Sequence, residues 1–333
     1  MANLQLTFAA QDYEHTRALF DGRVRADGID LTHIDLFPAY TFQRMLGKKE
    51  FAVSEMAMTL YFSTLDLADP PFIAIPVFPA RVFRHAAIFV RNGGPVREPK
   101  DLIGRRMGEF FFYGHDAGVW AKGILASEYG VPHDSYSYAI GGLGERPFGP
   151  QEWLPAKAPP HIKLEHIGPT RTLDQMLEAG EIDALVAPVS PPSLLKGEGK
   201  VRRLIENYEA AERAYFKKTG VFPIMHVLVI RRDIYRDNPW VARSLYDGFK
   251  AAKTIALQRY REAAFNTHAT FLMPWLTPHQ DGVSALMGQD WWPYGVAGNR
   301  ATLDAFARYH HEQGLSKRLR SPADLFAPET LAD

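Results

Sequence analysis

Short strand-like runs alternate with helical runs along this chain, and this order constrains its fold most. Residues 4–8 alternate apolar and polar side chains like a strand, residues 12–20 follow a helical pattern, and residues 28–34 form a second strand-like run. Residues 51–54 are again strand-like and lead into a helical pattern over residues 55–62. Such alternation predicts an α/β fold in which crossover helices flank a mainly parallel sheet.

The length of the chain predicts two lobes. A single hydrophobic core usually stops growing at about 250–300 residues, and this chain has 333. Residues 85–95 and 222–232 are apolar enough to be the two strands that cross between lobes. We therefore expect residues 1–93 and 225–333 to form lobe one and residues 94–224 to form lobe two, with a ligand-binding cleft between them.

Composition excludes several classes of function. Lys and Arg together number 38, as do Asp and Glu, so the net charge is zero, which argues against nucleic-acid and membrane-surface partners. The absence of cysteine excludes disulfides, thiolate metal sites and cysteine nucleophiles. The N-terminus shows no signal-peptide pattern, and no run reaches the ~18 apolar residues of a membrane helix, so we expect a cytoplasmic protein.

Two arginines and a histidine lie close together between apolar runs at residues 73–78 and 85–90. We predict that Arg81 and Arg84 anchor a small anion, because the planar guanidinium can bind a carboxylate through two hydrogen bonds. The alternative is that one of them pairs with an acidic side chain of lobe one. His85 titrates near neutrality, so it is predicted to donate or accept a proton in catalysis, unless it is a buried structural histidine.

Other polar side chains lie where predicted strands end, and in open α/β sheets the carboxyl ends of strands face the ligand. Glu55 is predicted to be a general base with a pKa raised by burial, or else a capping or ion-paired carboxylate. His115, near a helix N-terminus, is predicted to be an alternative acid–base group. The remaining candidates for substrate binding are Asp12, Tyr13, Ser54, Tyr113, Asp116, His226 and Trp292.

A structural role is the alternative for several of these residues. Asp12 could cap a helix, Asp116 could be a charge in the first turn of a helix, and His226 and Trp292 could pack in the core. Acidic and histidine side chains also allow a divalent metal ion, but no metal-binding spacing motif is present. We expect no cofactor, and a divalent metal ion is the alternative that stays open.

Several short segments of the sequence, each a weak signal alone, together form a pattern that is specific enough to indicate a family. They are residues 22–32 (GRVRADGIDLT), 54–56 (SEM), 79–85 (PARVFRH), 98–104 (EPKDLIG), 119–120 (VW), 222–226 (FPIMH), 238–240 (NPW), 292–295 (WPYG) and 309–316 (YHHEQGLS). Through these segments the chain resembles the 4,5-dihydroxyphthalate decarboxylase family, which has the type II periplasmic-binding-protein fold. The resemblance implies two lobes, each a mainly parallel sheet with flanking helices, and a cleft between them.

The resemblance also implies an enzyme, a carboxy-lyase of phthalate and aromatic-compound catabolism that acts on 4,5-dihydroxyphthalate or a close analogue. Such a reaction needs a base for a phenolic hydroxyl, an acid for the ring carbon and cations for the carboxylates. Residues 111–117 (FFYGHDA) depart from the Pro-Glu-Tyr-Gln-x-Thr-Ala pattern typical of the family and share only Tyr113 and Ala117 with it. We expect this altered segment to face the ligand and to change the preferred acid.

Two other functions stay open at this level. One is a non-catalytic solute-binding protein for a small aromatic carboxylate, and the other is a lyase or hydrolase acting on a different cyclic acid.

Residues 141–160, rich in Gly and Pro, are predicted to form a long loop. Leu325 and Phe326 are expected to be exposed and to allow self-association.

Overall fold

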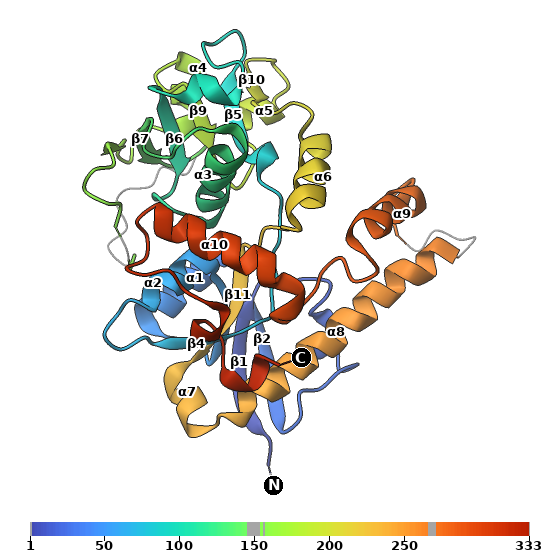
Figure 1. The fold of residues 1–333 in the computed structure, drawn as a ribbon. Coiled ribbons are helices and arrows are strands. Elements are labelled where there is room, and N and C mark those ends of the chain that lie inside the picture. The colour runs from blue at the N-terminus through green and yellow to red at the C-terminus, as the bar shows by residue number, and fades with distance from the viewer. Residues whose placement is uncertain (1, 145–153, 156, 266–270, 333) are drawn as a thin grey trace.

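The structure consists of two α/β lobes, each built around one sheet (Figure 1). This computed structural model describes residues 2–144, 154–155, 157–265 and 271–332. The chain begins in the lower lobe of Figure 1, passes into the upper lobe and returns to the lower one, where both termini lie. The predicted two-lobed α/β architecture is confirmed.

Lobe one, which holds both termini, contains a five-stranded sheet within the described residues. In spatial order its strands are β2 (Ile29–Asp35), β1 (Leu4–Ala10), β3 (Val53–Ala57), β11 (His226–Arg231) and β4 (Phe72–Ile75). Side chains such as Phe8, Val53 and Ile230 are fully buried. The central strands are therefore near-continuous apolar runs, as expected for strands that are covered on both faces.

Lobe two contains a six-stranded sheet within the described residues. In spatial order its strands are β10 (Val201–Arg203), β5 (Ile88–Arg91), β9 (Ala184–Val186), β6 (Arg106–Phe110), β7 (Ser137–Gly141) and β8 (Leu164–His166). The carboxyl end of β6 leads through a short turn into helix α3 (Asp116–Tyr129), and the first residue of this helix contacts Thr59 of lobe one.

Strand β5 is the first strand after the chain crosses into lobe two, and β11 is the first strand after it returns to lobe one. Both run antiparallel to their two neighbours, whereas the other neighbouring strands in each sheet are parallel. The sheets are therefore mixed. Because β5 begins at Ile88, the first change of sheet comes before residue 93, the expected boundary. The proposed lobe bounds, 1–93 with 225–333 and 94–224, stay a prediction.

Helices cover the sheets and connect their strands. Those in the described residues are α1 (Pro38–Lys48), α2 (Met58–Thr64), α3 (Asp116–Tyr129), α4 (Leu173–Ala179), α5 (Pro192–Leu195), α6 (Tyr208–Thr219), α7 (Arg232–Asp237), α8 (Trp240–Phe265), α9 (Leu276–Met287) and α10 (Arg300–Glu312). None of these helices combines the length and the apolar character needed to cross a membrane. The helix α10 belongs to the C-terminal part of the chain, yet it packs against α3 of lobe two (Figure 1).

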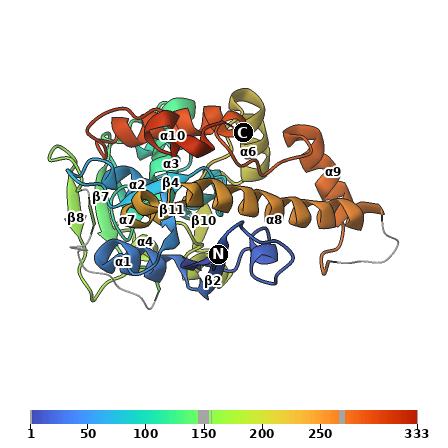
Figure 2. The same cartoon turned by 90° about the horizontal axis from the view of Figure 1, so that it is seen from below.

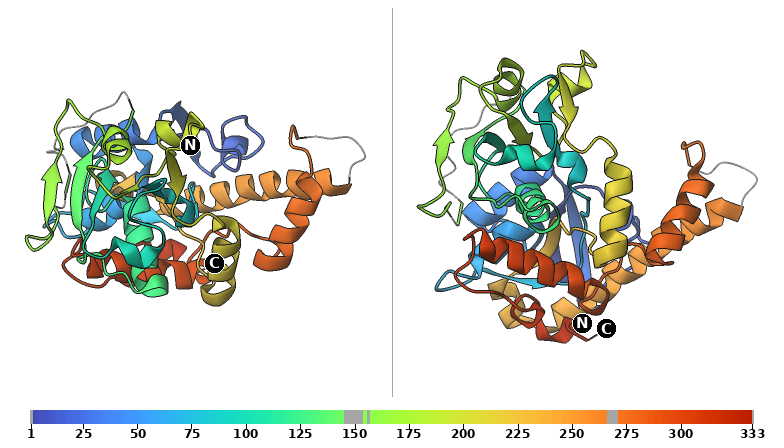
Figure 3. Two further views of the ribbon diagram at one scale, coloured as in Figure 1. Left: turned by 90° about the horizontal axis from the view of Figure 1, so that it is seen from above. Right: turned by 45° about the horizontal axis from the view of Figure 1, so that its top comes forward.

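The helices α8 and α9 form an arm that projects from the body of the molecule (Figures 2 and 3). Leu272 and Trp275, in the arm, are 108% and 83% exposed. Leu325 and Phe326 are instead buried, at 1% and 3% exposed, so the expectation that they form an apolar surface patch is wrong. Phe326 packs edge-on against Phe78 in the core of lobe one, at 6.1 Å between ring centroids.

Two predicted helices differ from the structure. Residues 12–20 form turns and a short 3-10 helix (Arg17–Leu19) instead of an α-helix. The helical pattern assigned to residues 55–62 begins at Met58, because pairing with β11 keeps residues 53–57 in strand β3. Of the predicted loop at 141–160, residues 145–153 and 156 lie outside the described residues.

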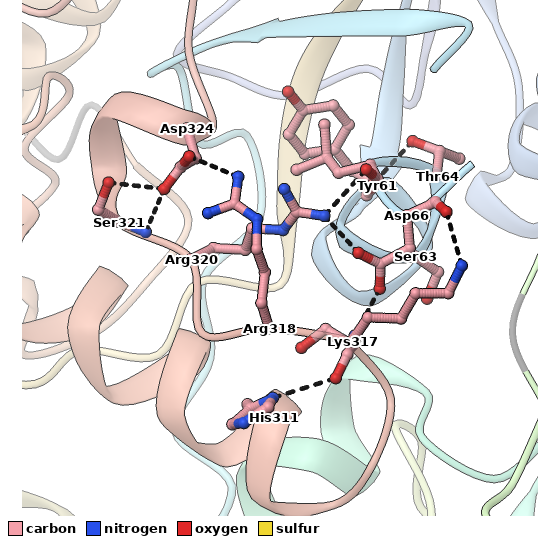
Figure 4. Close-up of polar contacts among 12 residues, drawn as sticks. Tyr61, Ser63, Thr64, Asp66, His311, Lys317, Arg318, Arg320, Ser321 and Asp324 are labelled. Carbon is pink, nitrogen blue, oxygen red and sulfur yellow. Dashed lines mark hydrogen bonds and ion pairs between the residues drawn. The ribbon is translucent and has the colours of Figure 1, made fainter. Parts of the chain in front are cut away.

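The C-terminal segment clasps the end of α2 (Figure 4). The Asp66 carboxylate, just after α2, accepts hydrogen bonds from the Arg320 guanidinium and from the backbone N–H of Lys317, the latter at 2.7 Å. The Lys317 ammonium also donates to the backbone oxygen of Asp66 at 3.1 Å. These contacts hold the far end of α2, whose first turn lies beside the polar cluster described next.

Candidate active site

Glu55 is a fully buried carboxylate in the middle of β3. The Tyr13 hydroxyl donates to its Oε1, and the backbone N–H of Gln11 donates to its Oε2 at 3.1 Å. His226 Nδ1 lies 2.5 Å from Oε1 and must donate, since a carboxylate can only accept. Three donors thus compensate the burial of this group.

His226 is placed beside Glu55 by the pairing of β3 with β11. The register pairs His226 with Ala57, so Glu55 and His226 are diagonal neighbours on one face of the sheet. With Nδ1–H donated to Glu55, Nε2 of the neutral ring is left as an acceptor. This nitrogen lies 3.9 Å from Oδ2 of Asp116 in lobe two. A histidine oriented by a carboxylate in this way is suited to act as a general base.

Asp116 is the first residue of α3 and faces the seam between the lobes. Its Oδ1 accepts a hydrogen bond from the backbone N–H of Thr59, at the start of α2 in lobe one, at 2.8 Å. Burial raises the pKa of Asp116 to about 7, although His226, Arg84 and the Thr59 hydrogen bond oppose that shift. Asp116 therefore loses its proton near neutrality and can act as a proton donor.

The turn that presents Asp116 contains the segment in which this chain departs from the family pattern. Phe111 has a φ of 70°, unusual for a residue with a side chain, and Gly114 has a φ of 86°. His115 is the N-cap of α3, and its Nδ1 accepts weakly from the backbone N–H of Gly118 at 3.4 Å. Burial holds the pKa of His115 well below its usual range, so this ring is neutral.

A buried ion pair that the sequence analysis missed lies directly beneath this turn. Lys122 Nζ donates to both carboxylate oxygens of Glu109, at 2.9 and 2.8 Å, and the two side chains are 0% and 1% exposed. The signal in the sequence was one charge in each of two otherwise uncharged runs, Glu109 in residues 107–113 (MGEFFFY) and Lys122 in residues 117–127 (AGVWAKGILAS). Charged residues are rarely buried unless they are paired.

Arg84 is a buried cation whose charge acts on Asp116. Its Nη1 donates to the backbone oxygen of Pro188 at 3.3 Å, and Nε lies 3.1 Å from the sulfur of Met225. Burial lowers its pKa to about 10, while the charges of Asp116 and Glu212 oppose that change, so Arg84 is protonated at neutral pH. Its Nη2 makes no hydrogen bond to the described residues and can bind an anion.

Arg81 holds the connection between the lobes. Its Nη1 and Nη2 donate to the backbone oxygens of Pro293, at 3.1 Å, and Phe222, at 2.8 Å. Arg81 also forms an antiparallel bridge with Ile224, so the two segments that cross between the lobes lie side by side. Because carbonyl oxygens occupy both terminal nitrogens, the geometry favours a structural role for Arg81, and the predicted contact with a substrate stays untested.

His85 lies apart from the acid–base cluster formed by Glu55, His226 and Asp116. Its ring packs against Tyr215 of α6, with 5.2 Å between ring centroids, and no hydrogen bond joins it to that cluster in the described part of the chain. Burial lowers the pKa of His85 to about 4, so the ring is neutral near pH 7. Its predicted catalytic role stays a prediction that this placement does not favour.

The other predicted site residues divide between the cluster and the rest of the lobes. Asp12 pairs at the surface with Arg17, at 2.7 Å, and caps no helix. The Ser54 hydroxyl donates to the backbone oxygen of Glu55 at 2.6 Å, and Tyr113 packs under Lys122. Trp292 Nε1 donates to the backbone oxygen of Phe78 at 2.9 Å, and its ring packs near His15 and Phe222.

The lobes meet closely beside this cluster. A cavity of about 10 Å³, room for one water molecule, is lined by Thr59 and Ser63 of α2 and by Tyr113 and Gly114 of the turn, among others. No group of three or more histidine and acidic side chains in the described residues has the placement needed to hold a metal ion.

The fold places the chain in a class shared with solute-binding proteins. The periplasmic sulfonate-binding protein SsuA of Methylobacillus flagellatus superposes with a TM-score of 0.55 over 99% of this chain and 93% of that one, at 13% identity. The aliphatic sulphonate-binding protein SsuA of Escherichia coli gives 0.52 over 100% of both chains, at 11% identity. The protein is thus a two-lobed α/β protein of the periplasmic-binding-protein type.

Sequence comparison places the chain more narrowly. It is 33% identical over 332 residues to a 4,5-dihydroxyphthalate decarboxylase of Comamonas testosteroni, covering 99% of this chain and 98% of the relative. A 4,5-dihydroxyphthalate decarboxylase of Pseudomonas putida is 31% identical over 217 residues, which cover 65% of this chain and 83% of that protein. No family model matches the sequence. The chain belongs to the 4,5-dihydroxyphthalate decarboxylase family.

Proposed function

We propose that this protein decarboxylates a hydroxylated aromatic carboxylic acid, 4,5-dihydroxyphthalate or a close analogue, without a metal or an organic cofactor. The observation that carries the proposal is the near full-length relationship to a 4,5-dihydroxyphthalate decarboxylase, at 33% identity. The acid–base cluster of Glu55, His226 and Asp116 supports it, because that reaction needs one base and one acid on the same ring. The protein is accordingly proposed to be a carboxy-lyase.

The chemistry follows from the position of a hydroxyl para to the departing carboxylate. Loss of the hydroxyl proton moves electron density to the ring carbon that carries this carboxylate, and that carbon then accepts a proton. The C–C bond breaks, its electron pair restores the aromatic ring, and CO₂ leaves. The resulting phenolate takes back a proton, so each turnover consumes one proton from solvent and needs no oxidant or reductant.

We assign the base to His226 and the acid to Asp116. His226 Nε2 is oriented by Glu55 and can accept the phenolic proton. Asp116 has a pKa near 7 through burial, so a substantial fraction carries the proton that the ring carbon requires at neutral pH. Nε2 and Oδ2 lie 3.9 Å apart, so the two groups have to move apart before an aromatic ring can lie between them.

Arg84 is assigned to the carboxylate that remains on the ring. Clamping the departing carboxylate would stabilise the ground state more than the transition state and would slow the reaction. Anchoring the other carboxylate orients the substrate. This contact is present in the ground state and in the transition state, so it does not oppose the loss of CO₂. Dicarboxylic acids with adjacent carboxylates are therefore the expected substrates.

The experiment is incubation of the protein with 4,5-dihydroxyphthalate and measurement of released CO₂. Phthalate without hydroxyls is the matched control and should release none, because no phenolic proton is available to remove. Asp116→Asn is expected to lower kcat by at least 100-fold while retaining the fold. Absence of turnover with any hydroxylated aromatic acid would contradict the proposal.

The second candidate is a solute-binding protein for a small aromatic carboxylate. The observation that favours it is the fold shared with the sulfonate-binding proteins. Tight binding of the acid without release of CO₂ would support this candidate instead. A third candidate, a lyase or hydrolase on another cyclic acid, rests on the altered segment 111–117 and predicts turnover of acids that lack the para hydroxyl.

A further inference from the structure

Glu109 and Lys122 join the strand before the Asp116 turn to the helix after it. Glu109 is the fourth residue of β6, and Lys122 lies two turns into α3. Besides its contacts with Lys122, Glu109 Oε1 accepts the backbone N–H of Gly114 at 2.8 Å. One carboxylate therefore holds both the helix and the middle of the turn that connects it to the sheet.

The turn needs such support because its backbone is strained. Phe111 adopts a left-handed conformation that costs free energy for any residue with a Cβ atom. The hydrogen bond from Gly114 to Glu109 lies three residues later, where the chain turns back toward α3. Without this acceptor, the N–H of Gly114 would be buried and unpaired, and the turn could relax.

The Glu109 carboxylate is closely packed against the first turn of α3. A Cβ atom added at Gly118 would lie 2.1 Å from Glu109 Oε1 and 3.2 Å from His115 Nε2. Lys122 Nζ lies 3.7 Å from the centroid of the Tyr113 ring, which closes the opposite side of the pair. The absence of a side chain at Gly118 allows the carboxylate to sit directly beneath the first turn of α3.

We propose that Glu109 and Lys122 are positioning residues for Asp116. Through the Gly114 hydrogen bond they hold the turn that presents this carboxyl group to Thr59 and His226. The proposal rests on the proposed function for its effect on catalysis, whereas its effect on the position of Asp116 does not depend on turnover. The pair itself touches neither His226 nor Arg84, the charged groups that face Asp116, so it acts through the backbone.

Two double variants distinguish a role of the pair in positioning Asp116 from a role in the stability of the fold alone. Glu109→Gln with Lys122→Met removes both charges but keeps an oxygen acceptor for Gly114, whereas Glu109→Leu with Lys122→Met removes the acceptor as well. Each removes the whole ion pair, which leaves no buried unpaired charge. For the Leu variant we expect kcat to fall at least tenfold with KM within threefold of the parent, and for the Gln variant we expect both constants within threefold.

Carboxyl NMR of protein labelled with ¹³C-aspartate measures the position of Asp116 without turnover, and Asp116→Asn assigns its signal. In the Leu variant the titration midpoint of Asp116 should fall by at least one pH unit, because a released turn exposes the carboxyl group to water. In the Gln variant it should stay within about 0.3 units. An unchanged midpoint in the folded Leu variant, or equal shifts in both variants, would overturn the proposal.

Gly118→Ala provides a second route if the double variants fold poorly. The added methyl group displaces the Glu109 carboxylate without changing any charge, and alanine favours helix formation. We expect the same fall in the Asp116 midpoint, and an unchanged midpoint contradicts the proposal. If the parent protein turns over no aromatic acid, the proposed function fails, and the Asp116 titration still decides whether the pair positions this residue.

Discussion

Asp116 is a buried carboxyl group whose ionisation links stability to pH. Its pKa is raised to about 7 by burial, from an ordinary value of 3.8. Between about pH 4 and pH 7 the folded protein retains this proton while the unfolded chain releases it. The free energy of unfolding therefore falls as the pH rises through this window, since the folded state binds more protons than the unfolded state.

Asp116→Asn is expected to remove this dependence, because an amide does not ionise and can still accept from Thr59. At pH 8 the variant should exceed the parent in free energy of unfolding by about 1–3 kcal/mol, on the scale of ~1.4 kcal/mol per pKa unit. The difference should shrink toward pH 4. Urea unfolding at both pH values measures it, and a variant less stable than the parent at pH 8 would refute the assignment.

Arg81 and Arg84 lie three residues apart and are expected to respond differently to substitution. Arg84→Met should raise KM for an aromatic dicarboxylate by about 10–100-fold, on the scale of ~1.5–3 kcal/mol for a charge-assisted hydrogen bond. Arg81→Met should leave KM within threefold and lower the free energy of unfolding by about 2–4 kcal/mol, because two buried carbonyl oxygens lose their donor. Steady-state kinetics and urea unfolding of both variants test the contrast; the reverse pattern would exchange the two roles.

At the scale of elements, α2 links the candidate site to the C-terminal segment. Its first turn donates the Thr59 N–H to Asp116, and its last turn is followed by Asp66, which the C-terminal segment clasps (Figure 4). The carboxylate of Asp66 and the guanidinium of Arg320 are 13% and 9% exposed, so this ion pair is largely shielded from solvent. The clasp therefore steadies a helix that contributes directly to the seam between the lobes.

Arg320→Ala is expected to lower the free energy of unfolding by about 2–4 kcal/mol, because it leaves the largely buried Asp66 carboxylate with the Lys317 N–H but without its charged partner. Arg318→Ala is the matched control, since Arg318 pairs with Asp324 but is 56% exposed. Exposed pairs contribute about 0–1 kcal/mol, so the control should change little. Equal losses in the two variants, measured by urea unfolding, would show that the clasp contributes no more than a surface pair.

At the scale of the whole molecule, α3 of lobe two contacts both a segment that crosses between the lobes and the C-terminal segment. The indole N–H of Trp120 on α3 donates to the backbone oxygen of Ile224 at 2.8 Å, and the Gln313 amide after α10 donates to the oxygen of Val119 at 2.9 Å. The Tyr309 ring of α10 fills the space beside Gly123 of α3. Movement of the lobes about the crossing segments therefore has to preserve or exchange these contacts.

Gly123→Ala tests how tightly α3 and α10 pack. The added Cβ atom would lie 2.2 Å from Cδ2 of the Tyr309 ring, so the helices must separate or the ring must move, which is expected to cost about 1–3 kcal/mol. Gly47→Ala in α1 is the control, because no atom lies within 4 Å of its added Cβ. There the gain in helix propensity should stabilise the protein by about 0.5–1 kcal/mol. Opposite shifts of the melting temperature are expected, and a stabilised Gly123→Ala variant would contradict the packing.

Local pattern was sufficient for some of the elements and for several members of the site. The alternation of apolar and polar residues predicted the strands over residues 4–8 and 28–34, which became β1 and β2, because burial of one face leaves a period of two in the sequence. Glu55, Tyr13, Asp116 and His226 were also predicted site residues, since each is a polar group at or near the end of an apolar run. These features depend on interactions between residues close in sequence.

Tertiary structure alone decided which of the candidates meet. Glu55 and His226 are 171 positions apart, and their contact depends on the register of β3 with β11. His85 has the same sequence signal as His226, but it packs against α6. The Glu109–Lys122 pair and the raised pKa of Asp116 exist because the folded chain removes these groups from water. Desolvation and strand register arise from long-range contacts, which a local sequence pattern does not specify.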